Sequence, residues 1–304
     1  MTLATTAAPL GGHGSRLGGR RARNRAVWGL CGLALALVVI PVVWIVVTTA
    51  KQALSHFHWS VITTYPVGNG GGLLNSIEGS ITLVLGVLIL AGTIGMAGGV
   101  YLAEYAGDGA KFLRGASEVL AGVPSIVVGY VGYAALVFQF HWGNSIVAGV
   151  IALSVIVVPY IVKTTEVALR TVPTAYREGG EALGMRPGYV LRKLVLRPAL
   201  PGVATGLILA VAISVGETAP LILTAGYSQN PPTFALHRSP VGYLTYNVFN
   251  DYNQPSTYLH QRAAVAALLL IVLVLVLIVV ARVIVMVTQR HAPDRPQRLG
   301  RARR

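Results

Sequence analysis

The distribution of charged residues divides the chain into apolar stretches long enough to cross a lipid bilayer. A transmembrane helix needs about 20 consecutive apolar residues. A window of 25 residues without Asp, Glu, Lys or Arg separates Arg25 from Lys51, and a second window of 25 residues ends before Glu104. The 44 uncharged residues of 119–162 are interrupted by His141-Trp-Gly-Asn, which is typical of a turn at the membrane surface. That window therefore predicts two spans.

Two more spans follow in the second half of the sequence. Residues 263–281 contain no charge over 19 positions, and 201–224 are apolar apart from Glu217. The sequence thus predicts an all-α, polytopic integral membrane protein with six transmembrane helices. We expect the spans at about 27–49, 78–103, 119–139, 144–163, 201–224 and 263–286.

The composition excludes a soluble globular protein. Of the 304 residues, 54% are hydrophobic and only 11% are charged, which is too few for a surface that faces water. The first apolar window is too long for the h-region of a signal peptide, about 7 to 15 residues, so we expect the first helix to be retained. The single cysteine, Cys31, lies in an apolar run and is interpreted as a packing residue.

Lys and Arg residues gather on one side of the predicted bundle. Of the 24 basic residues, 21 lie in the two tails and in the loops after the second and fourth spans. Because cytoplasmic loops carry the excess of positive charge, we expect both termini in the cytoplasm. Basic tails at 1–25 and 289–304 then flank a single transmembrane domain at 26–288. The net charge of +14 is an orientation signal, so we expect membrane lipid and no nucleic acid as a partner.

The loop at 165–200, after the fourth span, contains a short predicted helix. Pro173 is placed to open this helix and Gly184 to close it. Local physics leaves two roles open: the helix docks in a groove of a partner protein, or it rests on lipid headgroups. The candidate coupling surface consists of Tyr176, Glu178, Glu181, Ala182, Leu183, Gly184 and Met185.

This loop resembles the EAA loop of ABC importer permeases. The pattern of that loop is Glu-Ala-Ala, three residues, Gly, nine residues, Ile, one residue and Leu-Pro. The positions that fall on this spacing are Glu178, Gly184, Leu194 and Leu196. Gly179 and Gly180 stand in place of the two alanines, and Arg197 in place of the proline, with Pro198 one position later. These departures predict a looser helix and an altered turn after it. The resemblance implies that the loop couples the permease to the ATPase subunits through the candidate coupling surface.

Four further segments are similar to the PstA-type permeases of phosphate-specific ABC importers. They are Gly-Gly-Gly-Leu-Leu-Asn-Ser-Ile-Glu-Gly-Ser from Gly70, Val-Tyr-Leu-Ala-Glu-Tyr from Val100, Leu-Ala-Gly-Val-Pro-Ser-Ile-Val-Val-Gly from Leu120, and Val-Gly-Glu-Thr-Ala-Pro-Leu-Ile-Leu-Thr-Ala from Val215. The resemblance implies the MetI-like permease fold in the bacterial cytoplasmic membrane. It also implies a PstC-like companion permease, a PstB-like ATPase dimer and an extracytoplasmic PstS-like phosphate-binding protein as partners.

Glu217 is the acidic residue inside the predicted fifth span. A carboxylate in the bilayer is costly, so it should face the bundle interior or a water-filled cavity and be paired or protonated. PstA-type permeases often carry an Arg one helical turn earlier, where this chain has Ile213. A positive partner would therefore come from the companion permease, which favours a gating or inter-subunit role. A protonated side chain that hydrogen-bonds a neighbouring helix is the alternative.

A phosphate ion needs hydrogen-bond donors along its path. Ser214 is one candidate, although Ser and Thr side chains also bond to their own helix. The predicted path or gate consists of Asn75, Ser76, Ser80, Ser125, Glu217 and Thr218.

Two other features are interpreted from composition. The glycines of the second span, Gly92, Gly95, Gly98 and Gly99, favour tight helix packing over bending. The outer loop at 225–261 is rich in aromatic residues. It suits either docking of a solute-binding protein or an aromatic belt at the membrane interface.

The resemblance implies a non-catalytic membrane subunit of an ATP-driven phosphate importer. The chain has no Gly-x-x-x-x-Gly-Lys-Ser/Thr phosphate loop, so we expect ATP and Mg²⁺ to be bound by the partner ATPase. No catalytic residue, metal site or cofactor is predicted in this chain. The alternatives are a permease for another oxyanion or small solute, and an ion-driven secondary transporter that uses Glu217 as proton carrier. A membrane enzyme is disfavoured, because the spans offer no His, Cys or paired-acid cluster.

Overall fold

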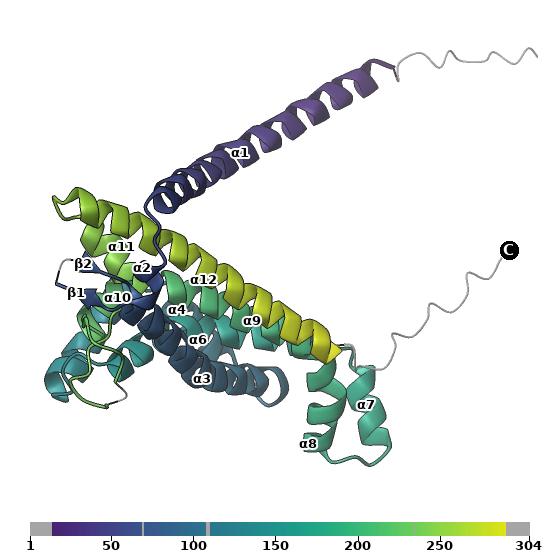
Figure 1. The fold of residues 1–304 in the computed structure, drawn as a ribbon. Helices are drawn as coiled ribbons and strands as arrows, with labels where there is room; N and C mark the ends of the chain where they lie inside the picture. The colour runs from purple at the N-terminus through teal and green to yellow at the C-terminus, as the bar shows by residue number, and fades with distance from the viewer. Residues whose placement is uncertain (1–13, 69, 108–109, 234, 290–304) are drawn as a thin grey trace, which may run out of the picture. The chain divides into compact units, whose positions relative to one another are not determined.

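The computed structural model describes residues 14–68, 70–107, 110–233 and 235–289, and they are mainly helical (Figure 1). Five helices are long and apolar enough to cross a membrane, and a sixth span arises if a bent helix pair counts as one. The long helices are α1 (Gly14–Ser55), α3 (Leu74–Glu104), α6 (Ile146–Arg170), α9 (Leu196–Gly216) and α12 (Thr257–Gln289). The prediction of an all-α, polytopic membrane protein is confirmed.

Shorter elements connect these helices. They are α2 (Ser60–Thr63), the antiparallel pair β1 (Pro66–Val67) and β2 (Gly70–Gly71), α4 (Ala110–Ala121), α5 (Ser125–Gly132), the π-helix η1 (Tyr133–Gln139), α7 (Ala175–Ala182), α8 (Pro187–Val190), the π-helix η2 (Leu191–Val195), α10 (Ala219–Thr224) and α11 (Leu244–Tyr252).

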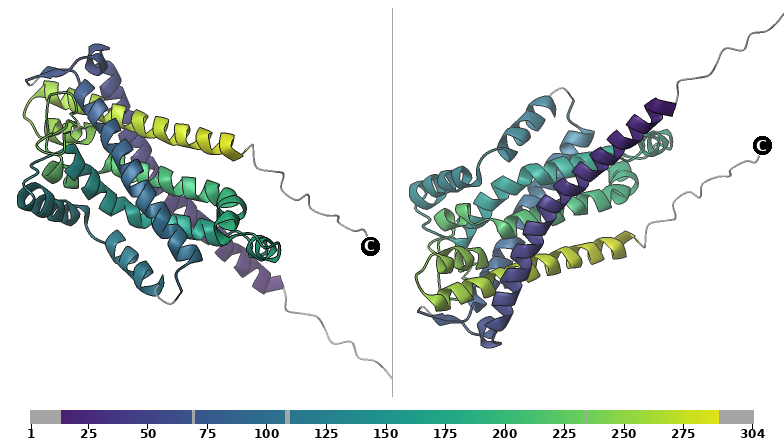
Figure 2. Two further views of the ribbon diagram at one scale, coloured as in Figure 1. Left: turned by 90° about the horizontal axis from the view of Figure 1, so that it is seen from below. Right: turned by 90° about the horizontal axis from the view of Figure 1, so that it is seen from above.

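The described residues divide into two compact units, of which the first ends at Gln52 and the second begins at Ala53. The first contains most of α1, an apolar helix with Pro41 inside it. In the second unit α10 and α11 lie at one end of the bundle, while α7 and α8 project from the other (Figures 1 and 2). These are called the α11 end and the α7 end below.

The core of the second unit is the crossing of α3, α6 and α9. Leu83, Leu153 and Ile161 are buried there. A Cβ atom on Gly95 would lie 2.6 Å from Cβ of Ile161, and one on Gly99 would lie 2.5 Å from Cβ of Thr165. Since real Cβ atoms do not approach so closely, these two glycines let the backbones of α3 and α6 meet. The predicted packing role is confirmed for both.

Gly99→Ala is expected to destabilise the protein by about 1–3 kcal/mol, because overpacking at a close helix crossing forces the backbones apart. Gly92→Ala is the matched control on the same helix, since its Cβ would meet only Leu207 Cδ2 at 3.5 Å. That control should be neutral or slightly stabilising. Thermal unfolding of the two purified variants measures the difference, and equal stability would contradict the packing role.

The expected third span is broken. Instead of a single helix over 119–139, α4 and the α5–η1 helix meet at an angle of 97°. Gly122 and Pro124 lie at the break. Proline has no N–H to donate to the preceding turn and disfavours helical geometry at Val123, so the helix ends before it.

The expected fifth span, 201–224, is also interrupted, and the prediction that Glu217 lies inside a continuous helix is wrong. Helix α9 ends at Gly216, and Glu217 has the extended angles φ −74° and ψ 134°. Pro220 lies in the first turn of α10 and cannot donate a hydrogen bond to the carbonyl of Gly216. The proline therefore ends α9 and lets a new helix begin.

Other boundaries differ by a few residues or more. Helix α3 begins four residues before the expected span, so Asn75 and Ser76 are helical. The outer loop expected at 225–261 contains α11, and α12 begins within it at Thr257. Residues 1–13 of the expected basic tail, and nearly all of the tail at 289–304, lie outside the described residues.

Candidate functional site

Helix α7 begins and ends where the sequence predicts. Its first turn contains hydrogen bonds from Tyr176 N to Pro173 O at 3.2 Å and from Arg177 N to Thr174 O at 2.8 Å. At the other end Gly184 N donates to Glu181 O at 2.9 Å and Met185 N to Gly180 O at 3.0 Å. With Gly184 at φ +70°, these two bonds form a Schellman motif, which satisfies the last carbonyls of the helix.

The candidate coupling surface is assembled on α7. Leu183 is 75% exposed and Tyr176 43% exposed. Met185 is half-buried against the cluster of Leu169, Val190 and Val195. The exposed members are Tyr176, Glu178, Glu181, Ala182, Leu183 and Gly184. An exposed leucine and tyrosine beside two carboxylates form a surface suited to contact with another protein.

The two glycines that replace the alanines of the EAA pattern have different surroundings. A Cβ atom on Gly180 would lie 2.6 Å from Cγ2 of Val190, whereas one on Gly179 would meet nothing within 4 Å. Gly180 therefore lets α7 pack closely on α8. After α8 the chain passes through η2 into α9, so Pro198 falls in the first turn of that helix. The π-helix η2 therefore lies where the sequence predicts an altered turn.

Arg177 connects α7 to two long helices. Its Nε donates to Oε2 of Glu104 at 3.1 Å and its Nη2 to Oε1 at 2.5 Å, which makes a bidentate ion pair with the last residue of α3. The guanidinium also donates to the carbonyl oxygens of Leu169 and Val172 at the end of α6, both at 3.1 Å. The hydrogen bond to Glu104 raises the pKa of Arg177, so the charged form is favoured.

A second group of ion pairs lies nearby, at the α7 ends of α4 and α6. Glu166 is buried and accepts from Nε of Arg114 at 2.7 Å, and it lies 3.0 Å from Nε of Arg170. Lys163 and Glu118 form a more exposed pair at 3.3 Å. These contacts attach α4 to α6 but do not include α7.

Three of the predicted path residues hold the outer segment on α3. Asn75 Nδ2 donates to the carbonyl of Ser228 at 2.7 Å, and Ser76 Oγ donates to Oδ1 of Asn247 at 2.6 Å. Ser80 Oγ accepts from the backbone N–H of Leu244 at 2.9 Å. All three side chains are buried. These bonds attach α3 to the loop after α10 and to α11.

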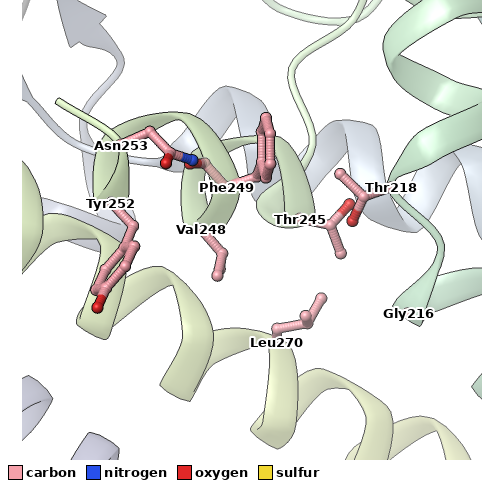
Figure 3. A pocket seen from close by; sticks show the side chains of 8 residues that line it. All are labelled: Gly216, Thr218, Thr245, Val248, Phe249, Tyr252, Asn253 and Leu270. Atoms are coloured by element: carbon pink, nitrogen blue, oxygen red, sulfur yellow. The ribbon is translucent and has the colours of Figure 1, made fainter.

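Two other predicted path residues, Glu217 and Thr218, lie at the break between α9 and α10. Glu217 and Thr218 are half-buried, and Thr245 Oγ1 donates to the carbonyl of Glu217 at 3.1 Å. Figure 3 shows Thr218 and Thr245 side by side, with Val248 and Leu270 pointing into the same space. The cavity there has a volume of about 410 Å³ and is lined by Gly216, Thr218, Thr245, Val248, Phe249, Tyr252, Asn253 and Leu270. Ser125, the first residue of α5, and Ser214, bonded to Ala210 O at 2.7 Å, are not among these lining residues.

Sequence reasoning missed a buried ion pair at the α11 end. Arg262 donates to Asp251 through Nε at 2.7 Å and Nη2 at 3.0 Å, and the two side chains are 9% and 1% exposed. The pair joins α11 to α12. A signal for it exists in the sequence, because few charged residues lie on that side and these two have opposite sign.

The family of the chain follows from a match of residues 95–290 to the family described as binding-protein-dependent transport system inner membrane component. The match includes α6, α7, α9 and α12. The chain belongs to this family. It is therefore a permease subunit of an ABC importer and a multi-pass protein of the cytoplasmic membrane. Permeases of this kind work with ATPase and binding-protein partners.

Individual relatives agree with this assignment. The chain is 51% identical over 264 residues to phosphate transport system permease protein PstA 2 of Mycobacterium bovis, covering 86% of this chain and 88% of the relative. It is 32% identical to PstA of Yersinia pestis, covering 87% of this chain and 90% of the relative. A chain of the MetNI methionine ABC transporter in inward-facing conformations superposes with a TM-score of 0.57 at 18% identity, covering 71% of this chain and 95% of that one. This last likeness confirms the MetI-like permease fold.

Proposed function

We propose that this permease forms part of the translocation path of an ATP-driven phosphate importer. The observation that carries the proposal is the 51% identity to a phosphate transport permease over 86% of the chain. The chain itself is non-catalytic in this proposal. ATP and Mg²⁺ are bound by a PstB-like ATPase dimer, which contacts the candidate coupling surface of α7 and the residues after it. A PstC-like permease completes the path, and a PstS-like protein delivers phosphate from outside the cell.

The α7 end faces the cytoplasm in this proposal, with both termini on that side. Supporting it, 21 of the 24 basic residues belong to that side of the chain. The exposed position of Tyr189 on α8, at the same end and outside the candidate coupling surface, allows a direct check. In a Cys31→Ser background, Tyr189→Cys should react with a membrane-impermeant maleimide only after the cells are permeabilised. Labelling of intact cells would show that the α7 end lies outside the cell, which contradicts the proposed orientation.

Uptake of labelled phosphate into vesicles tests the proposed function. The chain, reconstituted with its companion permease and ATPase, should import phosphate when ATP is present with the ATPase and binding protein is present on the opposite side. Sulfate or molybdate in place of phosphate tests the substrate class. Phosphate uptake by this chain alone, driven by a pH gradient, would instead identify a secondary transporter.

Glu217 and Thr218 are proposed to act at the gate, with Ser125 as a further path residue. The break at Glu217 gives α9 and α10 freedom to move relative to each other, and Thr245 fixes its backbone from α11. Glu217→Gln is therefore expected to change ATP hydrolysis in the absence of binding protein, while the concentration of phosphate at half-maximal uptake stays within about twofold. A large change in that concentration alone would mean that Glu217 contacts the anion.

A further inference from the structure

We propose that Arg177 and Glu104 are positioning residues that pass a displacement of α7 directly to α3. This inference rests on the proposed role of α7 as the element that contacts the ATPase. The pair is bidentate, and its side chains are only 23% and 15% exposed. A planar guanidinium in this arrangement fixes both the distance and the orientation of its partner, which a flexible surface pair does not.

The same guanidinium also holds the end of α6. The carbonyl oxygens of Leu169 and Val172 belong to the last turn of α6 and the residues after it. Leu169 O accepts a 3.3 Å bond from Val172 N in place of the usual bond from four residues later, because that residue is Pro173 and has no N–H. A cation is favoured at such a helix end because the carbonyl groups carry partial negative charge. Arg177 therefore joins α3, α6 and α7 through one rigid group.

The polypeptide that follows α7 connects it to α9 and not to α3. In chain order α7 is followed by α8, η2 and α9, and Gly180 packs α7 against Val190 of α8. Motion along this route reaches α9 and the break at Glu217. Helix α3 comes before α7 in the sequence and is separated from it by α4, α5 and α6, so α7 has no short covalent connection to α3. The Arg177–Glu104 ion pair provides a direct non-covalent connection between α7 and α3.

Helix α3 is suited to carry a displacement across the membrane. Its 31 residues extend about 46 Å at about 1.5 Å per residue. Glu104 lies at its α7 end, and Asn75, Ser76 and Ser80 at its other end hold the outer segment and α11. A movement imposed at Glu104 therefore reaches, through one helix, the elements that surround the cavity at the α11 end.

A double-variant cycle tests the inference in the reconstituted full complex. Arg177→Met and Glu104→Gln should each lower the phosphate imported per ATP hydrolysed by about tenfold, a typical coupling between distant sites. The double variant should be no worse than either single variant, because the residues act as a pair. Arg177→Lys, which keeps the charge but loses the planar fork, should recover part of the ratio. Uptake per ATP is the readout because lower stability alone reduces both quantities together.

Glu118→Gln is the matched control. It removes an ion pair with Lys163 at the same end of the bundle, without contact to α7, and should leave uptake per ATP unchanged. Wild-type uptake per ATP in Arg177→Met and Glu104→Gln would overturn the inference, as would a double variant whose loss is the product of the two single losses.

Leu183→Asp separates this inference from the proposed function. If α7 contacts the ATPase, a charge at the exposed Leu183 should prevent the ATPase from copurifying with the permeases. Normal copurification and uptake with Leu183→Asp would overturn the role of α7, and the inference with it. If Leu183→Asp loses the ATPase on purification but Arg177→Met keeps normal uptake per ATP, the inference is overturned and the role of α7 is not.

Discussion

Gly184→Val is expected to lower coupled phosphate uptake by about 5- to 150-fold while the protein remains folded in the membrane. Gly184 has φ +70°, and a Cβ atom there would meet nothing within 4 Å. The effect of valine is therefore backbone strain and not a steric clash with a neighbour. A β-branched residue in this conformation costs about 1–3 kcal/mol, which corresponds to a 5- to 150-fold loss of the native end of α7. Uptake of labelled phosphate per ATP hydrolysed measures the loss.

Gly184→Asn is the matched control, because asparagine adopts left-handed backbone angles far more readily than valine. It should keep most of the coupled uptake, and Gly184→Ala should fall between the two. If all three variants transport alike, the Schellman motif does not set the orientation of Leu183 and Met185. If asparagine is as harmful as valine, the side chain itself blocks a partner, and strain is not the cause.

The local signals in the sequence predicted α7 and the apolar spans well. Pro173 and Gly184 mark the first and last turns of α7 because a proline at a helix start and a glycine after a helix end act through backbone geometry alone. The apolar windows predicted the long helices for a similar reason, since the bilayer fixes the number of residues that each crossing needs.

Features that depend on distant contacts were not predictable in the same way. Pro220 is a local signal for a helix break, but the apolar residues on both sides of it led to the prediction of one continuous span, so the break at Glu217 was missed. Asn75, Ser76 and Ser80 have donors suited to an anion. The side chains of these three residues form hydrogen bonds with residues about 150 to 170 positions away, in which Asn75 and Ser76 donate and Ser80 accepts. No local pattern distinguishes an anchoring donor from a path donor.

Arg262→Met is expected to lower the free energy of unfolding by about 3–5 kcal/mol, because it leaves the carboxylate of Asp251 buried without its cation. Asp251 is 1% exposed and both of its oxygens accept from Arg262. Asp251→Asn should cost a similar amount by leaving the guanidinium unpaired. Chemical unfolding of the protein in nanodiscs measures these losses. Glu118→Gln, which breaks an exposed pair with Lys163, should cost no more than about 1 kcal/mol.

The double variant Asp251→Leu with Arg262→Met distinguishes a role of the buried ion pair in stability from a role in phosphate uptake. Replacing a buried ion pair by apolar side chains is often neutral or even stabilising, so this variant should regain most of the lost stability. Since the pair also fixes α11 against α12, at the wall of the cavity that Thr245 and Leu270 line, its uptake should stay impaired if the exact placement of α11 matters. Full recovery of both stability and uptake would mean that the charges themselves are dispensable. Stability no better than that of the single variants would show that the apolar replacements do not fit the space between the helices.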